Sequence, residues 1–128
     1  MNSLSIEVSH GEVIDKITIL VIKRDKIADP HKRRHVEQEL AKLRGRWDAS
    51  GLTWPTADAR ALEEVNRALW DVEDELRRHE ARGDFGEDFV ERARSVYRLN
   101  DERAALKRSL NERLGSELVE VKDYVTYS

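Results

Sequence analysis

The clearest helical signal in the chain is LEEVNRALWDVEDEL, residues 62–76. Its large aliphatic residues recur at alternating intervals of three and four positions: Leu62, Val65, Leu69, Val72 and Leu76. This spacing puts them on one face of an α-helix, as in helices that pack together in a bundle. We therefore expect a helix over about residues 58–82 that buries this face against other helices.

Capping signals predict the other helices. Ser9 and Glu12 stand three positions apart, the spacing of a capping box at the start of a helix. Asp29 and Pro30 are typical of the end of one helix and the start of the next, and Gly115 suits the position after a last turn. The expected helices cover about residues 11–28, 30–48, 58–82 and 86–114.

Both ends of the chain have extended patterns. Leu4, Ile6 and Val8 alternate with polar residues, which predicts a short strand over residues 4–9. The tail, residues 117–127, is rich in valine and tyrosine and is predicted to be extended. The expected fold is mainly α: a four-helix antiparallel bundle or two helical hairpins, with short N- and C-terminal β-strands able to pair.

The composition favours a single helical domain over residues 1–128. A chain of 128 residues is the size of one domain. Charged residues make up 38% of it, with 6 glycines and 2 prolines, which favours long amphipathic helices. The sequence has no cysteine, so disulfides, thiolate zinc sites and iron–sulfur clusters are excluded.

Several partner and cofactor classes are also disfavoured. The longest apolar stretch, residues 17–22, is too short for a membrane span, and the N-terminus lacks a signal-peptide pattern, so we expect a cytoplasmic protein. Residues 23–46 are basic and residues 58–82 acidic, yet a pI near 5.8 argues against a nucleic-acid binder. His31, His35 and Glu39 have a chelating spacing, but neighbouring cations would repel a metal ion, so we expect no metal and no cofactor.

Polar residues interrupt the apolar seam of the helix expected over residues 86–114. Asn100, Arg103 and Lys107 occupy three successive seam positions, and buried cations need partners. Glu73 lies at the edge of the apolar face of the helix over residues 58–82, with Asn66 two turns earlier on that helix.

The first predicted helix adds further polar residues to this set. It places Arg24 in the middle of its apolar arc, and Asp15 and Thr18 on the opposite side.

Three interpretations of these residues compete. In the first, they form an internal polar network in which Glu73 neutralises Arg103 or Lys107. In the second, Arg103, Lys107 and Arg24 bind a small anionic ligand in a pocket between helices. In the third, the pocket is catalytic with Glu73 as acid or base, but no nucleophile–base pair accompanies it, so no catalytic residue is assigned.

Two features predict an interface with another chain. The helix over residues 86–114 would be about 42 Å long, which is long for a chain of this size and predicts cover from a second subunit in a homodimer. Trp70 lies off the apolar seam of its helix, where it either covers the flank of the bundle or anchors an interface. Tyr97 is the second candidate interface residue.

Four blocks of residues together resemble a small bacterial family of uncharacterised proteins, known only as a domain of unknown function. The resemblance covers nearly the whole chain and implies a bacterial, intracellular, single-domain protein without an assigned activity. It includes Glu73, Asn100 and Arg103. The blocks are Gly11–Lys23, Asn66–Asp74, Ala93–Arg103 and Gly115–Tyr124.

A fainter resemblance concerns one helix. Ile14, Asp15 and Ile17, followed by Leu20 and Arg24, are similar to the first helix of the all-helical chorismate mutases. Those enzymes clamp a dicarboxylate with arginine and lysine from several helices, although residues 48–58 and the terminal strands depart from their pattern. The leading expectation is a non-catalytic binding or assembly module with a small anionic ligand or a protein partner. The alternative is a small-anion-binding enzyme of the mutase kind.

Overall fold

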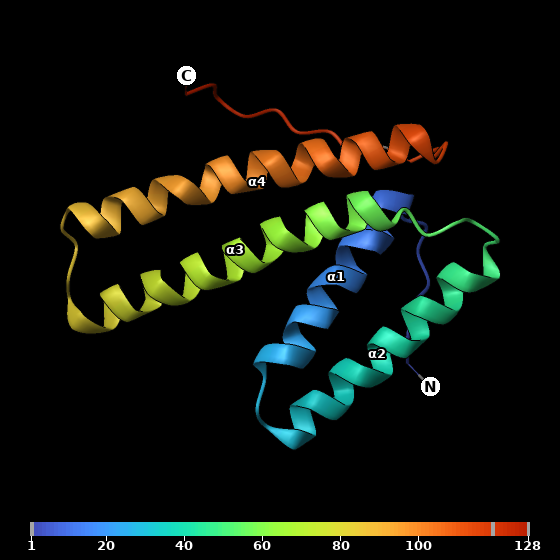
Figure 1. Cartoon of the computed structure of the whole chain (residues 1–128), viewed down its shortest axis with the longest axis horizontal. Helices are drawn as coiled ribbons and strands as arrows, with labels where there is room; N and C mark the ends of the chain where they lie inside the picture. Colours follow the sequence, from blue (N-terminus) through green and yellow to red (C-terminus); the bar gives the residue numbers. More distant parts are fainter. Residues whose placement is uncertain (1, 119, 128) are drawn as a thin grey trace.

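The computed structural model describes residues 2–118 and 120–127, and this part of the chain forms four α-helices (Figure 1). The expectation of a mainly helical fold is confirmed. The helices differ from their expected bounds by at most two residues. They are α1 (His10–Lys26), α2 (Pro30–Ala49), α3 (Thr56–Arg82) and α4 (Glu87–Arg113).

Local capping explains where three of these helices begin or end. The Ser9 hydroxyl accepts a hydrogen bond of 3.2 Å from the Glu12 N–H at the start of α1. Asp29 caps α2 by accepting from the His31 N–H at 2.8 Å, with Pro30 in the first turn. α3 ends at Gly83, whose φ of 67° is the left-handed conformation that glycine adopts without strain.

The helices form two hairpins that meet at α1. α3 and α4 lie antiparallel along their whole length, and α1 and α2 form the second hairpin beside one half of them (Figure 1). α1 contacts all three other helices, whereas α2 packs against α1. The outer half of the α3–α4 hairpin therefore extends past α1 as an arm, which includes the turn at residues 83–86.

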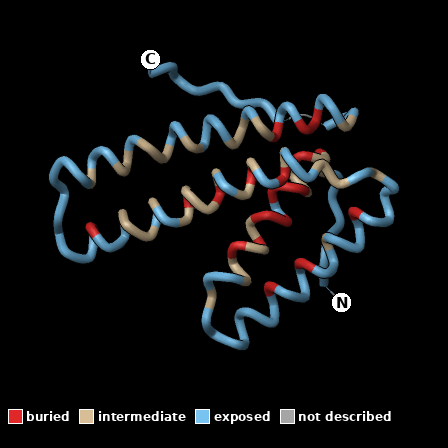
Figure 2. Tube along the Cα trace, in the orientation of Figure 1, coloured by how far each residue is buried: buried red, intermediate tan, exposed pale blue. Residues whose placement is uncertain are grey.

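The hydrophobic core surrounds α1, and buried positions in Figure 2 concentrate there. Burying one aliphatic side chain of this kind contributes about 1.5–3 kcal/mol. Most residues of the arm are exposed and most of the others are half-buried, so the arm adds less to stability than the α1 region. The core members are Ile14, Ile17, Leu20, Val36, Leu40, Trp47, Ala59, Leu62 and Leu110.

The predicted terminal strands are wrong for the described residues. Residues 2–9 and 120–127 have no regular secondary structure and form no strand. His10 and Ser116 are held together by a 3.3 Å hydrogen bond, yet the two segments leave this point in different directions (Figure 1). An isolated two-stranded ribbon is only marginally stable in water, and the tail makes side-chain contacts on α4 instead.

Of the helices in the described part of the chain, none combines the length and apolarity that crossing a membrane requires.

Candidate functional site

The Asp15 carboxylate is the centre of a polar cluster where α1, α3 and α4 meet. Its exposed fraction is 0%. Arg103 donates to both of its oxygens, from Nε to Oδ1 at 3.0 Å and from Nη2 to Oδ2 at 2.6 Å. The Asn66 amide donates to Asp15 Oδ1 at 2.8 Å and to Thr18 Oγ1 at 3.0 Å. This two-point Arg–carboxylate geometry is strong and directional, so it fixes how the three helices meet.

Lys107 lies one turn along α4 and faces three carboxylates. Its Nζ is 2.7 Å from Glu12, 2.8 Å from Glu120 and 3.9 Å from Asp15, and its side chain is 9% exposed. Burial by itself would lower the pKa of Lys107, but the hydrogen bonds to Glu12 and Glu120 outweigh it and raise the pKa. The hydrogen bond to Asp15 likewise raises the pKa of Arg103. Both side chains therefore remain cationic.

A close approach of α1 to α4 brings these groups together. The Asn111 side-chain oxygen accepts a 2.7 Å hydrogen bond from the Gly11 N–H. A Cβ at Gly11 would lie 2.7 Å from the Lys107 carbonyl oxygen, closer than van der Waals contact allows. Glycine at this position lets the first turn of α1 approach α4, which puts Glu12 within reach of Lys107.

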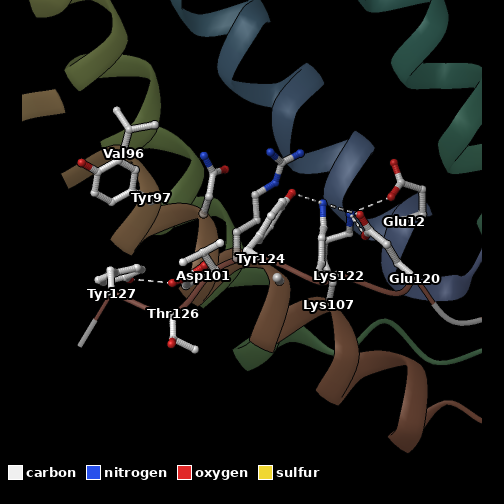
Figure 3. A pocket seen from close by; sticks show the side chains of 14 residues that line it. Glu12, Val96, Tyr97, Asp101, Lys107, Glu120, Lys122, Tyr124, Thr126 and Tyr127 are labelled. Carbon is white, nitrogen blue, oxygen red and sulfur yellow. Dashed lines mark hydrogen bonds and ion pairs between the residues drawn. The ribbon is translucent and has the colours of Figure 1, made fainter. Parts of the chain in front are cut away.

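The tail, residues 117–118 and 120–127 in the described chain, runs back along α4 (Figures 1 and 3). Glu120 lies between two ammonium groups, with Lys107 2.8 Å from Oε2 and Lys122 2.7 Å from Oε1. These hydrogen bonds lower the pKa of Glu120 to about 2. Further along, the Tyr127 hydroxyl donates to Asp101 at 2.5 Å.

A pocket of about 820 Å³ lies between α4 and the tail, and we call it the tail pocket (Figure 3). Its charged end holds Lys107, Lys122 and Glu120. The chain has 3 tyrosines, and all of them, Tyr97, Tyr124 and Tyr127, line this pocket. The Tyr97 and Tyr127 ring centroids are 5.5 Å apart. The pocket thus combines paired ammonium groups with aromatic surface.

A second hollow of about 500 Å³ lies in the corner where the arm leaves α1. Asn100 and Arg103 line both this corner hollow and the tail pocket. Half-buried Trp70 and exposed Glu73 line the corner hollow but not the tail pocket.

The expected pairing of Glu73 with Arg103 or Lys107 is wrong, because the carboxylates that bind these cations belong to Asp15, Glu12 and Glu120. Arg24 pairs with Asp25 at 3.8 Å and lines neither the tail pocket nor the corner hollow. Asn66, Arg103 and Lys107 are brought together around Asp15. Within the described residues, no three histidine or carboxylate side chains are placed to hold a metal ion.

Comparison with known proteins gives a family. The model of a family of unknown function, DUF6165, matches residues 4–128. The chain belongs to this family. No curated protein and no solved structure matches it. The resemblance to a domain of unknown function is thereby confirmed, and membership of DUF6165 assigns no activity.

Sequence reasoning named Asp15 without making it the partner of Arg103, and it missed Glu12 and the tail as parts of the site. Asp15 stands on the side of α1 opposite the predicted apolar arc, and its sequence neighbours give no sign that this side meets both α3 and α4. Glu12 is explained locally by the capping box, and the tail by strand propensity. The available signal was Asp15 with Thr18 one turn later on α1, matched by Asn66 on α3, because buried polar residues need polar partners.

Proposed function

We propose that this chain is a non-catalytic binding module and that the tail pocket takes an organic anion with an aromatic ring. The observation that carries the proposal is the convergence of all 3 tyrosines and two lysine ammonium groups on one pocket. Its volume of about 820 Å³ lies in the range of small-molecule sites. Exposed tyrosines are typical of binding surfaces, because each offers an apolar ring and a polar hydroxyl.

The charged end of the pocket favours a carboxylate. Lys107 and Lys122 already hold the two oxygens of one carboxylate at 2.8 and 2.7 Å. Arg103 adds a donor at the edge of the pocket, since Nε and Nη2 bind Asp15 and Nη1 has no partner among the described residues. A compound with one carboxylate and a ring two or three bonds away fits this arrangement.

The alternative, an enzyme with a mutase-like cation clamp, has less support. That clamp requires Arg24, Arg103 and Lys107 to converge, and Arg24 pairs with Asp25 outside the pocket. Arg103 is also committed to Asp15 through two of its nitrogens.

Thermal unfolding with a panel of aryl carboxylates and their uncharged amides tests the proposal. A carboxylate at 100 times its dissociation constant is expected to stabilise the fold by about 2.7 kcal/mol, a shift of several degrees. Lys122→Gln should reduce the shift, and Lys42→Gln, an exposed lysine on α2, should not. Equal shifts with the amides, or no shift with any carboxylate, would contradict the proposal.

We also propose, as a second role, assembly into a homodimer through the arm. Phe85 and Val90 are exposed at the end of the arm, where α1 and α2 do not reach (Figures 1 and 2). The charges support this role. Among the four described helices α2, which is basic, contacts only α1, whereas residues 58–82, which include the α3 half of the arm, carry a net negative charge. We keep, as part of the proposal, the bacterial origin and the cytoplasmic location that the sequence predicts.

A further inference from the structure

The Glu120 carboxylate differs from the other two that face Lys107. Asp15 is fully buried, and the backbone of Glu12, whose side chain is 31% exposed, is held in the first turn of α1. Glu120 lies on the tail, and its side chain is 37% exposed. A rotation about its side-chain bonds can therefore move it into solvent while the helices stay in place.

The tail is held to the body by side chains. Among residues 117–118 and 120–127, no backbone group forms a hydrogen bond with another backbone group. Val121 and Val125 are 85% and 93% exposed. Segments with few buried apolar groups and no backbone pairing are the least stable parts of a fold. Local rearrangement around Glu120 therefore breaks no secondary structure.

Charge balance requires such a rearrangement before an anion binds. With Glu120 in place, the cations Arg103, Lys107 and Lys122 pair with an equal number of carboxylates, on Glu12, Asp15 and Glu120. The carboxylate of Asp101 lines the same pocket and adds a further negative charge. A second anion added to this cluster would leave an uncompensated charge in a partly buried site. If the Glu120 carboxylate leaves, one incoming negative charge restores the balance, whereas a dianion exceeds it.

We propose that Glu120 is a built-in competitor of the ligand, and that the ligand is an aromatic monocarboxylate that takes the place of its side chain between Lys107 and Lys122. This inference rests on the proposed function and adds the ligand class and the means of control. Glu120 turns to solvent as the ligand enters, and returns when the ligand leaves, so the lysines always face one carboxylate.

Tyr124 indicates where the ring of the ligand lies. The Tyr124 hydroxyl is 3.5 Å from Lys122 Nζ, and that nitrogen is 5.7 Å from the Tyr124 ring centroid. In Figure 3 Tyr124 lies beside the two lysines, with its hydroxyl toward Lys122. A ring carried by the carboxylate would therefore pack against Tyr124, inside the tail pocket.

Fluorine NMR of the full-length chain labelled with 3-fluorotyrosine tests the exchange. All 3 tyrosines line the pocket, so every signal reports on it, and single Tyr→Phe variants assign the signals. The probes are 4-hydroxyphenylacetate, its uncharged amide and the dianion phenyl phosphate. The variants are Glu120→Gln and the control Glu117→Gln, which makes the same change at an exposed residue of the tail.

The expected result is a saturable shift of the Tyr124 signal with 4-hydroxyphenylacetate, a weaker response to phenyl phosphate, and none to the amide. If Glu120 fills its position in about nine molecules of ten, Glu120→Gln binds the probe about tenfold more tightly. Glu117→Gln binds it like the unsubstituted chain.

The two ways of failing are distinct. Equal affinity of the unsubstituted chain and Glu120→Gln for the probe would overturn the exchange and leave the proposed function standing. If neither chain responds to 4-hydroxyphenylacetate at millimolar concentration, the proposed function falls and the exchange falls with it.

Discussion

Asp15 shows how much one residue can determine in this chain. A fully buried carboxylate is strongly unfavourable unless both of its oxygens are paired. Here Arg103 and Asn66 supply three hydrogen bonds from α4 and α3. An arrangement of the three helices that lost one of these bonds would leave the buried carboxylate underpaired, so Asp15 favours the observed arrangement as well as stabilising it.

Replacing Asp15 by asparagine should therefore destabilise the chain by about 3 kcal/mol, the lower part of the range for breaking a buried pair, because Arg103 is partly exposed. Urea unfolding followed by circular dichroism measures the change. Glu73→Gln is the control, since Glu73 is exposed, and its unfolding free energy should stay within about 0.5 kcal/mol. A loss below 1 kcal/mol for Asp15→Asn would show that the cluster is not a structural centre.

At the scale of the element, the contact between α1 and α4 depends on Gly11. Gly11→Ala places a methyl group against the Lys107 carbonyl, and overpacking of this kind destabilises by about 1–3 kcal/mol. Gly45→Ala on α2 is the matched control, because nothing lies within 4 Å of its Cβ position. Alanine there should stabilise the helix by about 1 kcal/mol. Thermal unfolding of both variants checks the opposite signs, and two variants that both gain stability would refute the close approach.

The tail should respond to acid through Glu120. Because its pKa in the folded chain, about 2, lies below the ordinary 4.5, the stabilisation is complete above pH 4.5 and is lost as the pH falls toward 2. The fluorotyrosine signal of Tyr124, which lies beside Lys122, should therefore change below pH 4.5 in the unsubstituted chain. In Glu120→Gln this transition should be absent, and a transition centred above pH 4.5 would exclude Glu120 as its cause.

The sequence predicts structure that depends on contacts between residues close in the chain, and it does not predict contacts between distant residues. The helices follow from neighbours in the chain, such as Ser9 with Glu12, or Leu62 with Leu69. The pairing of Asp15 with Arg103 spans 88 positions, and nothing local distinguishes Asp15 from Glu73 as the partner. Lys107 and Arg103 could be singled out because cations on an apolar seam need partners, but the identity of those partners depends on how the hairpins pack. The path of the tail along α4 could not be predicted, because its residues have the pattern of a strand and the described fold has no sheet.

At the scale of the whole molecule, the uncovered arm predicts self-association. Sedimentation at high micromolar concentration is expected to give the mass of a dimer. Val90→Asn on the arm should shift the population toward monomer, and Val121→Asn, the same change at an exposed residue of the tail, should not. A strictly monomeric mass for the unsubstituted chain would contradict the homodimer and leave the tail pocket unaffected.

The central claim is that the tail pocket receives a carboxylate in place of Glu120, and a crystal structure of the full-length chain with 4-hydroxyphenylacetate tests it most directly. We expect the carboxylate of the probe within hydrogen-bond distance of Lys107 Nζ and Lys122 Nζ, with the Glu120 side chain turned to solvent. If Glu120 still lies between the two lysines at a saturating concentration of the probe, and the probe is absent from the pocket, the account is wrong.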